Sequence, residues 1–365
     1  MRKKPEEAKT AKAYEALLDK LGQFPTAGPR TSHIYSIMEE LFSEDEALLA
    51  SGLPMHSEEL DHIAAGMGIE PAALGRKLEA LADRGLVFAG TKNGKKVYRL
   101  FPFLPGIAEL QFMKAEVTPR NKKLAKLFDE YYNSGWGKAA FTASTPFSRV
   151  ITIEQEVPGG GAIMPYDRVS HLIDSTTSLG LAHCYCRHEA DLLGKSCGKQ
   201  KETCMVLGPF AEYAIERGFA RRVGKDEMKE LLKKCEDEGL VHITDNIQSK
   251  VNFICNCCGC CCGILGTITK LNIPSAIATS GFVARSETSE CTGCEICVEV
   301  CEVNAVELRE KSAFVLTERC IGCALCVSHC PSGAMRLENS PAGKPEPSAS
   351  LKEIGMKILM SKAGN

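Results

Sequence analysis

The sequence predicts an α+β protein built from several domains, and three observations lead to this prediction. The N-terminal part shows helical spacing of apolar residues followed by a hairpin signal. The central part alternates helical and strand patterns among ten closely grouped cysteines, and two four-cysteine runs near the C-terminus each lead into a short strand. A chain of 365 residues is long enough for two or three domains. We predict segment boundaries at residues 1–118, 119–279, 280–339 and 340–365.

The first domain is predicted to contain helices and one β-hairpin. Apolar spacing marks helical structure over residues 31–53, around Ile63, and from Pro71 to Gly85. Asn93-Gly94, between two apolar runs, is a strong signal for a two-residue hairpin loop. This order of elements resembles a winged helix-turn-helix domain.

Resemblance to a winged helix implies two different functions. One is DNA binding, with the third helix in a major groove and the hairpin lysines on phosphates. Charge argues against it, because residues 1–120 hold sixteen Lys and Arg against seventeen Asp and Glu. Winged helices also serve as protein-docking modules, so docking or scaffolding is favoured and DNA binding stays the alternative.

Residues 119–279 are predicted to form a compact, cysteine-rich α+β middle domain. Helical patterns cover residues 119–135, 166–179, 209–218 and 225–239, and strand patterns cover 150–153 and 240–243. Cys235, alone on the last of these helices, is expected to be a packed, inert thiol.

Ten further cysteines of the middle domain are too closely grouped for ordinary core packing. They are Cys184, Cys186, Cys197, Cys204, Cys255, Cys257, Cys258, Cys260, Cys261 and Cys262. In an extended segment, cysteines two apart face one side, so each Cys-x-Cys pair can present two thiolates together. Soft thiolates favour iron–sulfur clusters, zinc or Cu(I). We therefore expect a metal centre here. Cys197 and Cys204 are able to close a loop onto Cys184 and Cys186, so that these four thiolates meet at one centre, but the sequence does not decide which cysteines share one.

Basic side chains beside the first cysteine pair are a further expectation. Arg187, His183 and His188 flank it, where positive or hydrogen-bonding groups would stabilise the reduced, more negative state of a cluster.

Two four-cysteine runs with equal spacing lie near the C-terminus. They are Cys291-x2-Cys294-x2-Cys297-x3-Cys301 and Cys320-x2-Cys323-x2-Cys326-x3-Cys330, and residues 301–308 parallel residues 330–337 at an offset of 29. Two-residue gaps wind a chain around a cubane so that three thiolates reach three irons. The spacing predicts two [4Fe–4S] clusters, whereas zinc held by paired Cys-x2-Cys units would not need the third or fourth cysteine of each run.

Over about residues 280–339 this pattern resembles the bacterial two-cluster ferredoxins. In that arrangement the last cysteine of each run ligates the other cluster. The resemblance therefore implies one set of Cys291, Cys294, Cys297 and Cys330 and another of Cys320, Cys323, Cys326 and Cys301 in a two-cluster ferredoxin-like domain. Glu302 is a departure, because a proline usually follows the first run. This puts only the local turn and the cluster potential in doubt.

The middle cysteines together with the ferredoxin-like domain give a second resemblance. From Cys184 to Cys262 the order Cys-x-Cys-Arg, Cys, Cys, Cys-x-Cys-Cys-x-Cys-Cys-Cys is similar to a family of largely uncharacterised iron–sulfur proteins of anaerobic microbes, over about residues 165–340. It favours at least one further Fe–S cluster in the middle domain, with structural zinc or a thiol redox relay as alternatives.

Composition and the chain ends limit the remaining possibilities. The net charge of −2 gives no general attraction to polyanions or lipids, no apolar window is long enough for a membrane span, and the first residues lack a signal sequence. We expect a cytoplasmic protein with reduced thiols. Residues 340–365 are predicted to be a linker and an amphipathic helix, marked by Leu351, Ile354 and Ile358. This helix is expected to dock on the body or on a partner, and folding back on the body is favoured.

These features predict an iron–sulfur electron-transfer protein. Single electrons would pass between redox partner proteins through the clusters, within a larger anaerobic oxidoreductase system rather than in an independent catalyst. The alternative is an iron–sulfur redox-sensing transcription regulator that uses the winged helix. A third hypothesis is an enzyme with substrate chemistry at an incompletely ligated cluster.

Overall fold

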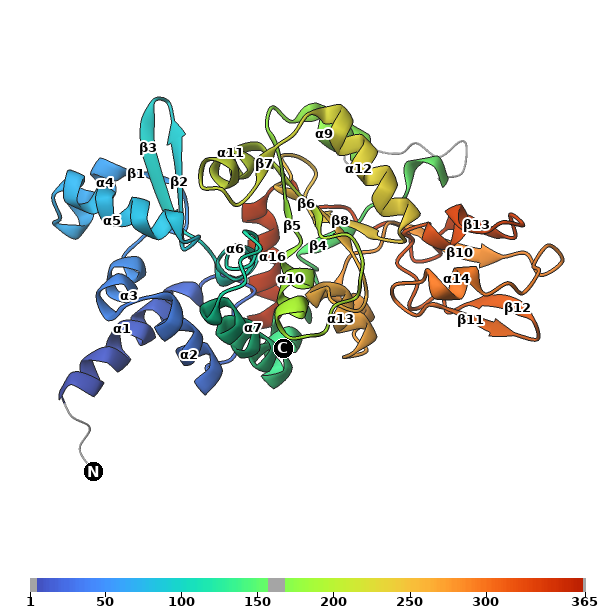
Figure 1. The fold of residues 1–365 in the computed structure, drawn as a ribbon, viewed down its shortest axis with the longest axis horizontal. Helices are drawn as coiled ribbons and strands as arrows, with labels where there is room; N and C mark the ends of the chain where they lie inside the picture. Colours follow the sequence, from blue (N-terminus) through green and yellow to red (C-terminus); the bar gives the residue numbers. More distant parts are fainter. Residues whose placement is uncertain (1–4, 157–167, 364–365) are drawn as a thin grey trace. The chain divides into compact units, whose positions relative to one another are not determined.

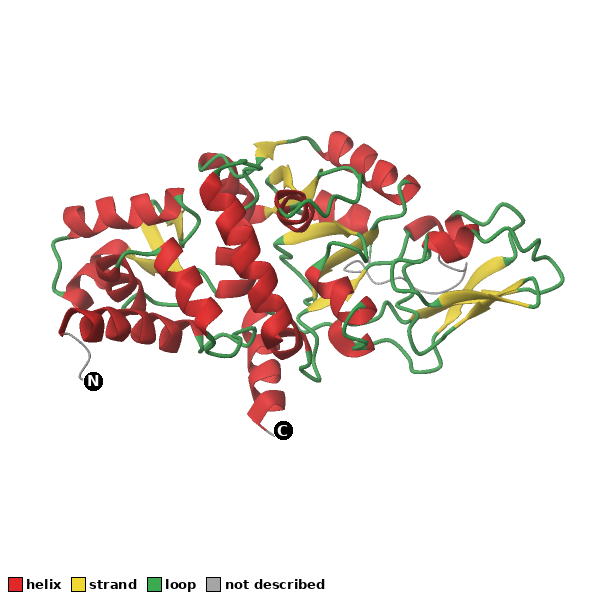
Figure 2. Ribbon diagram, turned by 60° about the horizontal axis from the view of Figure 1, so that its bottom comes forward, coloured by secondary structure: helices red, strands yellow, loops and turns green. Residues whose placement is uncertain are grey.

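Two compact units, each mixing helix and strand, make up the protein in the computed structural model (Figures 1 and 2), which describes residues 5–156 and 168–363. The first unit contains the chain up to Ala140 together with residues 188–196 and 213–219, and the second contains residues 141–187, 197–212 and the chain from Ala220 onward. The prediction of a mixed helix-and-sheet protein is confirmed, and the predicted domain boundaries stay predictions.

Helices and a small sheet form the first unit. The helices are α1 (Pro5–Leu21), α2 (Ser32–Leu41), α3 (Glu44–Ser51), α4 (Leu60–Met67), α5 (Pro71–Asp83), α6 (Ala108–Leu110), α7 (Pro119–Tyr131) and α8 (Gly137–Phe141). The strands are β1 (Glu58–Glu59), β2 (Val87–Lys92) and β3 (Lys95–Leu100), which pair in the antiparallel order β1-β3-β2.

Local sequence signals explain several of these elements. α5 begins at Pro71, and the Glu70 carboxylate accepts hydrogen bonds from the free backbone amides of Ala72 and Ala73 at 3.0 and 2.7 Å. At the β2–β3 turn, Asn93 and Gly94 have φ of 53° and 77°, the left-handed values that a two-residue hairpin loop requires. The predicted hairpin and third helix are therefore present.

An aromatic cluster ties residues 213–219 to the first unit. The Tyr213 ring lies 5.4 Å from Phe88 and 5.3 Å from Phe101, centroid to centroid, and stacks on Phe219 at 6.0 Å. The Tyr213 hydroxyl donates a 2.7 Å hydrogen bond to the Ala82 carbonyl. This packing explains why the segment belongs with residues far from it in the sequence.

The second unit is built on a six-stranded sheet. Its strands are β4 (Ser148–Val150), β5 (Leu179–His183), β6 (Glu202–Leu207), β7 (Arg221–Arg222), β8 (Val241–Asp245) and β9 (Phe253–Cys257), in the order β4-β8-β9-β6-β5-β7 with antiparallel neighbours. Its helices include α9 (Val169–Ser175), α12 (Lys225–Asp237) and α13 (Gly263–Thr269), whereas α10 (Tyr185–Leu192) and α11 (Gly208–Glu216) begin in the second unit and end in the first. β9 lies inside the sheet, between β6 and β8.

Two apolar clusters cover opposite faces of this sheet, as strand alternation requires. One joins Ile254 of β9 to α9, α12 and the C-terminal helix α16 (Leu351–Ala363), whose Ile354 and Ile358 are buried. The other joins Ile243 of β8 to α13 and to Leu325 in the C-terminal cysteine module. The C-terminal helix thus folds back onto the second unit, and the cysteine module shares a core with the sheet.

The cysteine module repeats a short helix and a short strand. It contains β10 (Phe282–Ser286), α14 (Ile296–Glu299), β11 (Val306–Arg309), β12 (Ser312–Val315), α15 (Leu325–Ser328) and β13 (Met335–Asn339). β10 pairs with β13 and β11 with β12. The residues before the two helices, Glu295 and Ala324, have φ of 65° and 74°, so the sequence repeat is also a structural repeat.

None of the helices in the described part of the chain is long and apolar enough to cross a membrane.

We expect the Tyr213 contacts to stabilise the first unit measurably. Tyr213→Phe should lower the free energy of unfolding by about 1 kcal/mol, because the Ala82 carbonyl loses its donor. Tyr213→Ala should lower it by about 3–5 kcal/mol through the cavity it leaves. Fluorescence of the single tryptophan, Trp136, reports urea unfolding of the same unit. The exposed control Val117→Ala should change the free energy of unfolding by less than about 0.5 kcal/mol. Equal urea midpoints of unfolding for Tyr213→Ala and Val117→Ala would contradict the expectation.

Candidate metal centres

Two hollows in the C-terminal module are each lined by four cysteines. Cys291, Cys294, Cys297 and Cys330 line one. Cys301, Cys320, Cys323 and Cys326 line the other. In each case the fourth cysteine comes from the other run, so these are the two sets that a crossed arrangement implies.

The walls of both hollows suit a cluster with bridging sulfides. Apolar side chains such as Met335 in the first and Leu325 in the second complete the lining and limit access of water. Backbone amides of Ala313 and Ala305 donate hydrogen bonds to the sulfurs of Cys291 and Cys301 at 3.4 and 3.1 Å. Such donors stabilise the more negative, reduced state of a thiolate-bound cluster.

Burial keeps several of these thiols protonated when no metal is bound. It raises the pKa of the Cys323 and Cys326 thiols above the ordinary value. A positively charged iron centre offsets the cost of ionising them, so cluster binding should release protons. Four converging thiols around one apolar hollow therefore fit a [4Fe–4S] cubane.

Six cysteines of the middle domain form a second, largely buried set, which we call the six-thiol group: Cys184, Cys186, Cys204, Cys255, Cys257 and Cys262. Interactions between neighbouring thiols run from Cys204 to Cys255, Cys257, Cys262, Cys186 and finally Cys184. Cys255 and Cys257 share one face of β9, and Cys204 lies on the neighbouring strand β6. Adjacent strands thus bring together thiols about fifty residues apart in the sequence.

The predicted extended conformation of Cys184 and Cys186 is wrong. β5 ends at His183, and α10 begins at Tyr185, so Cys186 lies in the first turn of a helix. The two thiols still interact. Because a helix begins directly after β5, the alternation of side chains along a strand, on which the prediction rested, does not apply to Cys186.

A third set, which we call the four-thiol group, consists of Cys197, Cys258, Cys260 and Cys261. Their sulfur atoms all lie within 4.8 Å of one another. Cys258 is buried, whereas Cys260 is exposed. Interaction with Cys261, helped by Cys260 and the nearby Arg187, lowers the pKa of the Cys258 thiol despite its burial. This direction favours ionisation of Cys258 when a cation binds.

Arg187 lies between the two middle-domain groups and is almost fully buried, with 1% exposure. Its guanidinium donates hydrogen bonds to the Asn256 carbonyl at 3.1 and 3.2 Å and to the Cys258 sulfur at 3.7 Å. Burial alone would lower the pKa of Arg187, but interactions with Cys184 and Cys258 raise it above the ordinary value. The arginine expected beside the first cysteine pair thus contacts the second group directly.

The two histidines expected beside that pair are placed differently. His183 ends β5 and is half-buried. His188 belongs to the first unit, where its ring lies 3.0 Å from the Glu116 carbonyl oxygen.

Glu302, where the ferredoxin pattern has proline, connects the cysteine module to the four-thiol group. Its carboxylate accepts a 2.6 Å hydrogen bond from the Gly259 amide and forms an ion pair with Lys199. Gly259 lies between Cys258 and Cys260, and Lys199 lies two residues after Cys197. Sequence reasoning missed this role, and the departure from proline was the one available signal.

Comparison with known proteins identifies one part of the chain. Residues 290–334 match the model of the 4Fe-4S dicluster domain. No curated protein and no solved structure matches the chain. The chain therefore contains an iron–sulfur module of the ferredoxin type, and the matched segment includes all eight cysteines of the two hollows.

Double substitutions should test whether the fourth ligands cross between the two runs. Because Cys294 and Cys330 line one hollow, Cys294→Ala with Cys330→Ala should remove one cluster, about four irons per chain. Cys294→Ala with Cys301→Ala should remove both clusters, about eight irons. Iron and acid-labile sulfide analysis after anaerobic purification measures the losses. The opposite pattern would show that each run ligates its own cluster.

Proposed function

We propose that the protein is an iron–sulfur electron-transfer protein that passes single electrons through two ferredoxin cubanes and at least one further cluster in the middle domain. The observation that carries the proposal is the pair of hollows, each lined by four cysteines, inside a matched dicluster domain. Clusters bound there would accept and donate single electrons with little structural change.

The protein's own residues would bind these clusters and set their environment. The thiols would release their protons and hold iron, and the apolar walls would limit solvent access. The amides of Ala305 and Ala313 would direct hydrogen-bond donors at ligand sulfurs. Each of these factors changes a reduction potential.

The six-thiol group supports the proposal of a further cluster. Its six thiols exceed the four that one tetrahedral ion or one [4Fe–4S] cluster takes. Soft thiolate donors suit iron–sulfur clusters, and the neighbouring dicluster domain favours iron over zinc.

Partner proteins would deliver and accept the electrons, as in a larger anaerobic, cytoplasmic oxidoreductase system. The hollow that includes Cys294 supports this proposal, because Cys294 is exposed and lies beside exposed Glu295 and Glu299. Residues 285–339 hold nine Asp and Glu against five Lys and Arg. An acidic surface around an exposed ligand favours docking of a basic redox partner.

Metal analysis should decide whether a cluster binds outside the cysteine module. We expect about twelve irons or more per anaerobically purified chain, with similar amounts of sulfide, since the module accounts for about eight. Cys257→Ala should remove the additional iron and its sulfide and keep the EPR signals of the module. Cys235→Ala, at another buried cysteine, is the matched control. It should change neither the iron and sulfide content nor the EPR signals of the module. About eight irons in the wild type would contradict the additional cluster.

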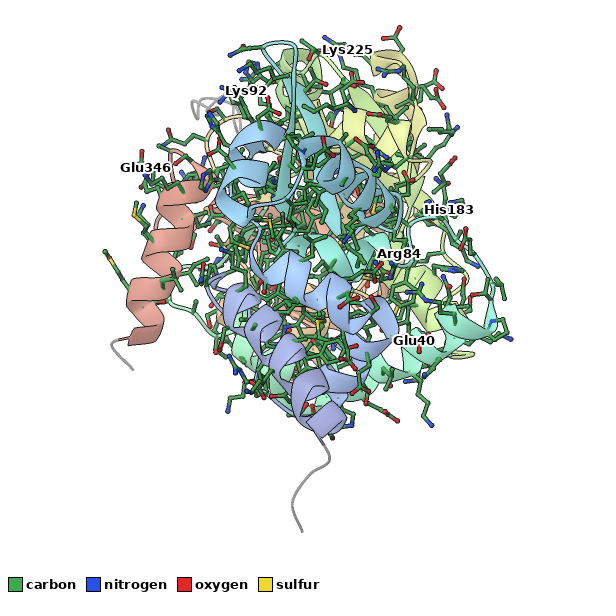
Figure 3. All side chains as sticks on the ribbon, turned by 90° about the vertical axis from the view of Figure 1, so that its left-hand side faces the viewer. Glu40, Arg84, Lys92, His183, Lys225 and Glu346 are labelled. Atoms are coloured by element: carbon green, nitrogen blue, oxygen red, sulfur yellow. The ribbon has the colours of Figure 1, made fainter. Side chains whose placement is uncertain are left out.

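A redox-sensing transcription regulator is the second candidate function. The order of α4, α5 and the β2–β3 hairpin favours it, since a winged helix would present Arg76 and Lys77 of α5 and Lys92 of β2, all exposed (Figure 3 labels Lys92). Two hairpin lysines are less available to phosphates, because Lys95 pairs with Glu59 at 2.6 Å and Lys96 with Glu79 at 3.4 Å.

DNA binding separates the two candidates. We expect the holoprotein to bind a pool of random duplexes weakly, with an affinity that falls steeply with salt and enriches no sequence. Arg76→Ala with Lys77→Ala should leave the reduction and reoxidation of the clusters unchanged. Selection of one duplex sequence, with an affinity that changes on cluster oxidation and is lost in this double variant, would favour the regulator.

A further inference from the structure

We propose that Cys197, Cys258, Cys260 and Cys261 hold a single thiophilic metal ion, Zn²⁺ or Fe²⁺, in a centre separate from the six-thiol group. This site lies beyond the proposed cluster chain, because a single ion needs no bridging sulfide and the site stands whether or not the cubanes transfer electrons.

The spacing of the sulfurs fits one tetrahedral ion. Thiolates bound at about 2.3 Å to a tetrahedral metal lie about 3.8 Å from one another. All four sulfurs here lie within 4.8 Å of one another, and those of Cys260 and Cys261 are 3.7 Å apart. Thiolates on a cubane are held farther apart, because four irons and four sulfides lie between them.

The cysteine module provides an internal comparison. Its eight cysteines line two hollows in a matched dicluster domain. Yet among the described residues, no three module sulfurs all lie within 4.8 Å of one another. The chain therefore spaces its thiols widely where cubanes belong and closely at the four-thiol group.

Strand alternation separates the four-thiol group from the six-thiol group. Cys255 and Cys257 pack against the apolar cluster shared with the cysteine module. Cys258, the next residue after β9, packs with Cys197 and Cys261 against the cluster on the other face of the sheet. The two groups therefore pack against different apolar clusters, which favours two separate centres over one centre that uses all ten thiols.

Surrounding charges suit a single divalent ion with four thiolates. Such a site carries a net charge of about −2. The Arg187 guanidinium donates to Cys258, and the Lys270 ammonium donates to the Cys260 carbonyl at 2.9 Å. Arg187 and Lys270 thus offset this charge beside residues 258–261. The hydrogen bond from Arg187 also orients the Cys258 sulfur as a metal ligand.

Residues 258–261, which carry three of the four thiols, are held against the cysteine module. Glu302 follows Cys301, a lining residue of the second hollow, and accepts the hydrogen bond from Gly259. A Cβ at Gly259 would lie 2.1 Å from the Glu302 carbonyl oxygen, so the approach requires glycine. Zn²⁺ at this site would stabilise the contact, whereas Fe²⁺ could also exchange an electron with the module.

Metal and sulfide analysis of Cys260→Ser tests the site. Cys260 is the exposed ligand, so its replacement should disturb the fold least. We expect the anaerobically purified variant to lose one metal ion per chain, zinc or iron, with labile sulfide and the EPR signals of the clusters unchanged. Cys235→Ser is the matched control and should lose no metal. The identity of the lost ion distinguishes zinc from iron.

Two outcomes would overturn the proposal. One is loss of iron and sulfide together in Cys260→Ser, because Cys260 would then ligate a cluster. The other is no loss of metal. Wild-type protein loaded with Co²⁺ gives a second measurement that does not depend on folding of the variant. Visible ligand-field bands of a tetrahedral cobalt thiolate would support the site, and their absence would contradict it. A chain that keeps the ion but contains no sulfide would support this site and contradict the proposed electron transfer.

Discussion

Burial of the Arg187 guanidinium is the constraint on which the middle domain depends. Removing an unpaired cation from water costs several kcal/mol, so the surroundings must supply negative charge and hydrogen-bond acceptors. The Asn256 carbonyl and the Thr203 hydroxyl accept its hydrogen bonds. The Cys258 sulfur accepts a further hydrogen bond from this guanidinium. Metal binding, which keeps thiols ionised, would place negative charge beside the cation and should therefore stabilise the fold.

A second constraint is the attachment of the cysteine module to the middle sheet. One apolar cluster contains Val241 of β8, Leu265 of α13 and Leu325 of the module, so the module completes the core of the sheet. Glu302 adds a polar connection to Gly259 within the four-thiol group. The module is therefore attached to the middle sheet by both apolar packing and a hydrogen bond. The ferredoxin-type module is thus built into the second unit.

Local signals explain how much of this protein could be predicted from sequence. The equal spacing of the two cysteine runs depends only on how a short loop surrounds a cubane, so the cluster module was predictable without tertiary structure. Asn93-Gly94 predicted its hairpin because few residue pairs adopt left-handed φ at low cost. The identity of the middle-domain ligands was predictable only as a set, because crowded thiolates indicate metal without indicating which of them meet.

The sequence by itself determined the α+β character, the two four-cysteine runs of the dicluster domain and the presence of a cysteine-rich middle region. Each of these follows from residue types that lie close together in the sequence. Only the tertiary structure decided how the ten middle thiols divide. That division depends on where β9 ends, on which strand lies beside it, and on a helix that begins at Tyr185 instead of a continued strand. It also depends on Glu302 reaching a backbone amide 43 residues away. These are long-range contacts, and short-range spacing carries no information about which distant segments become neighbours.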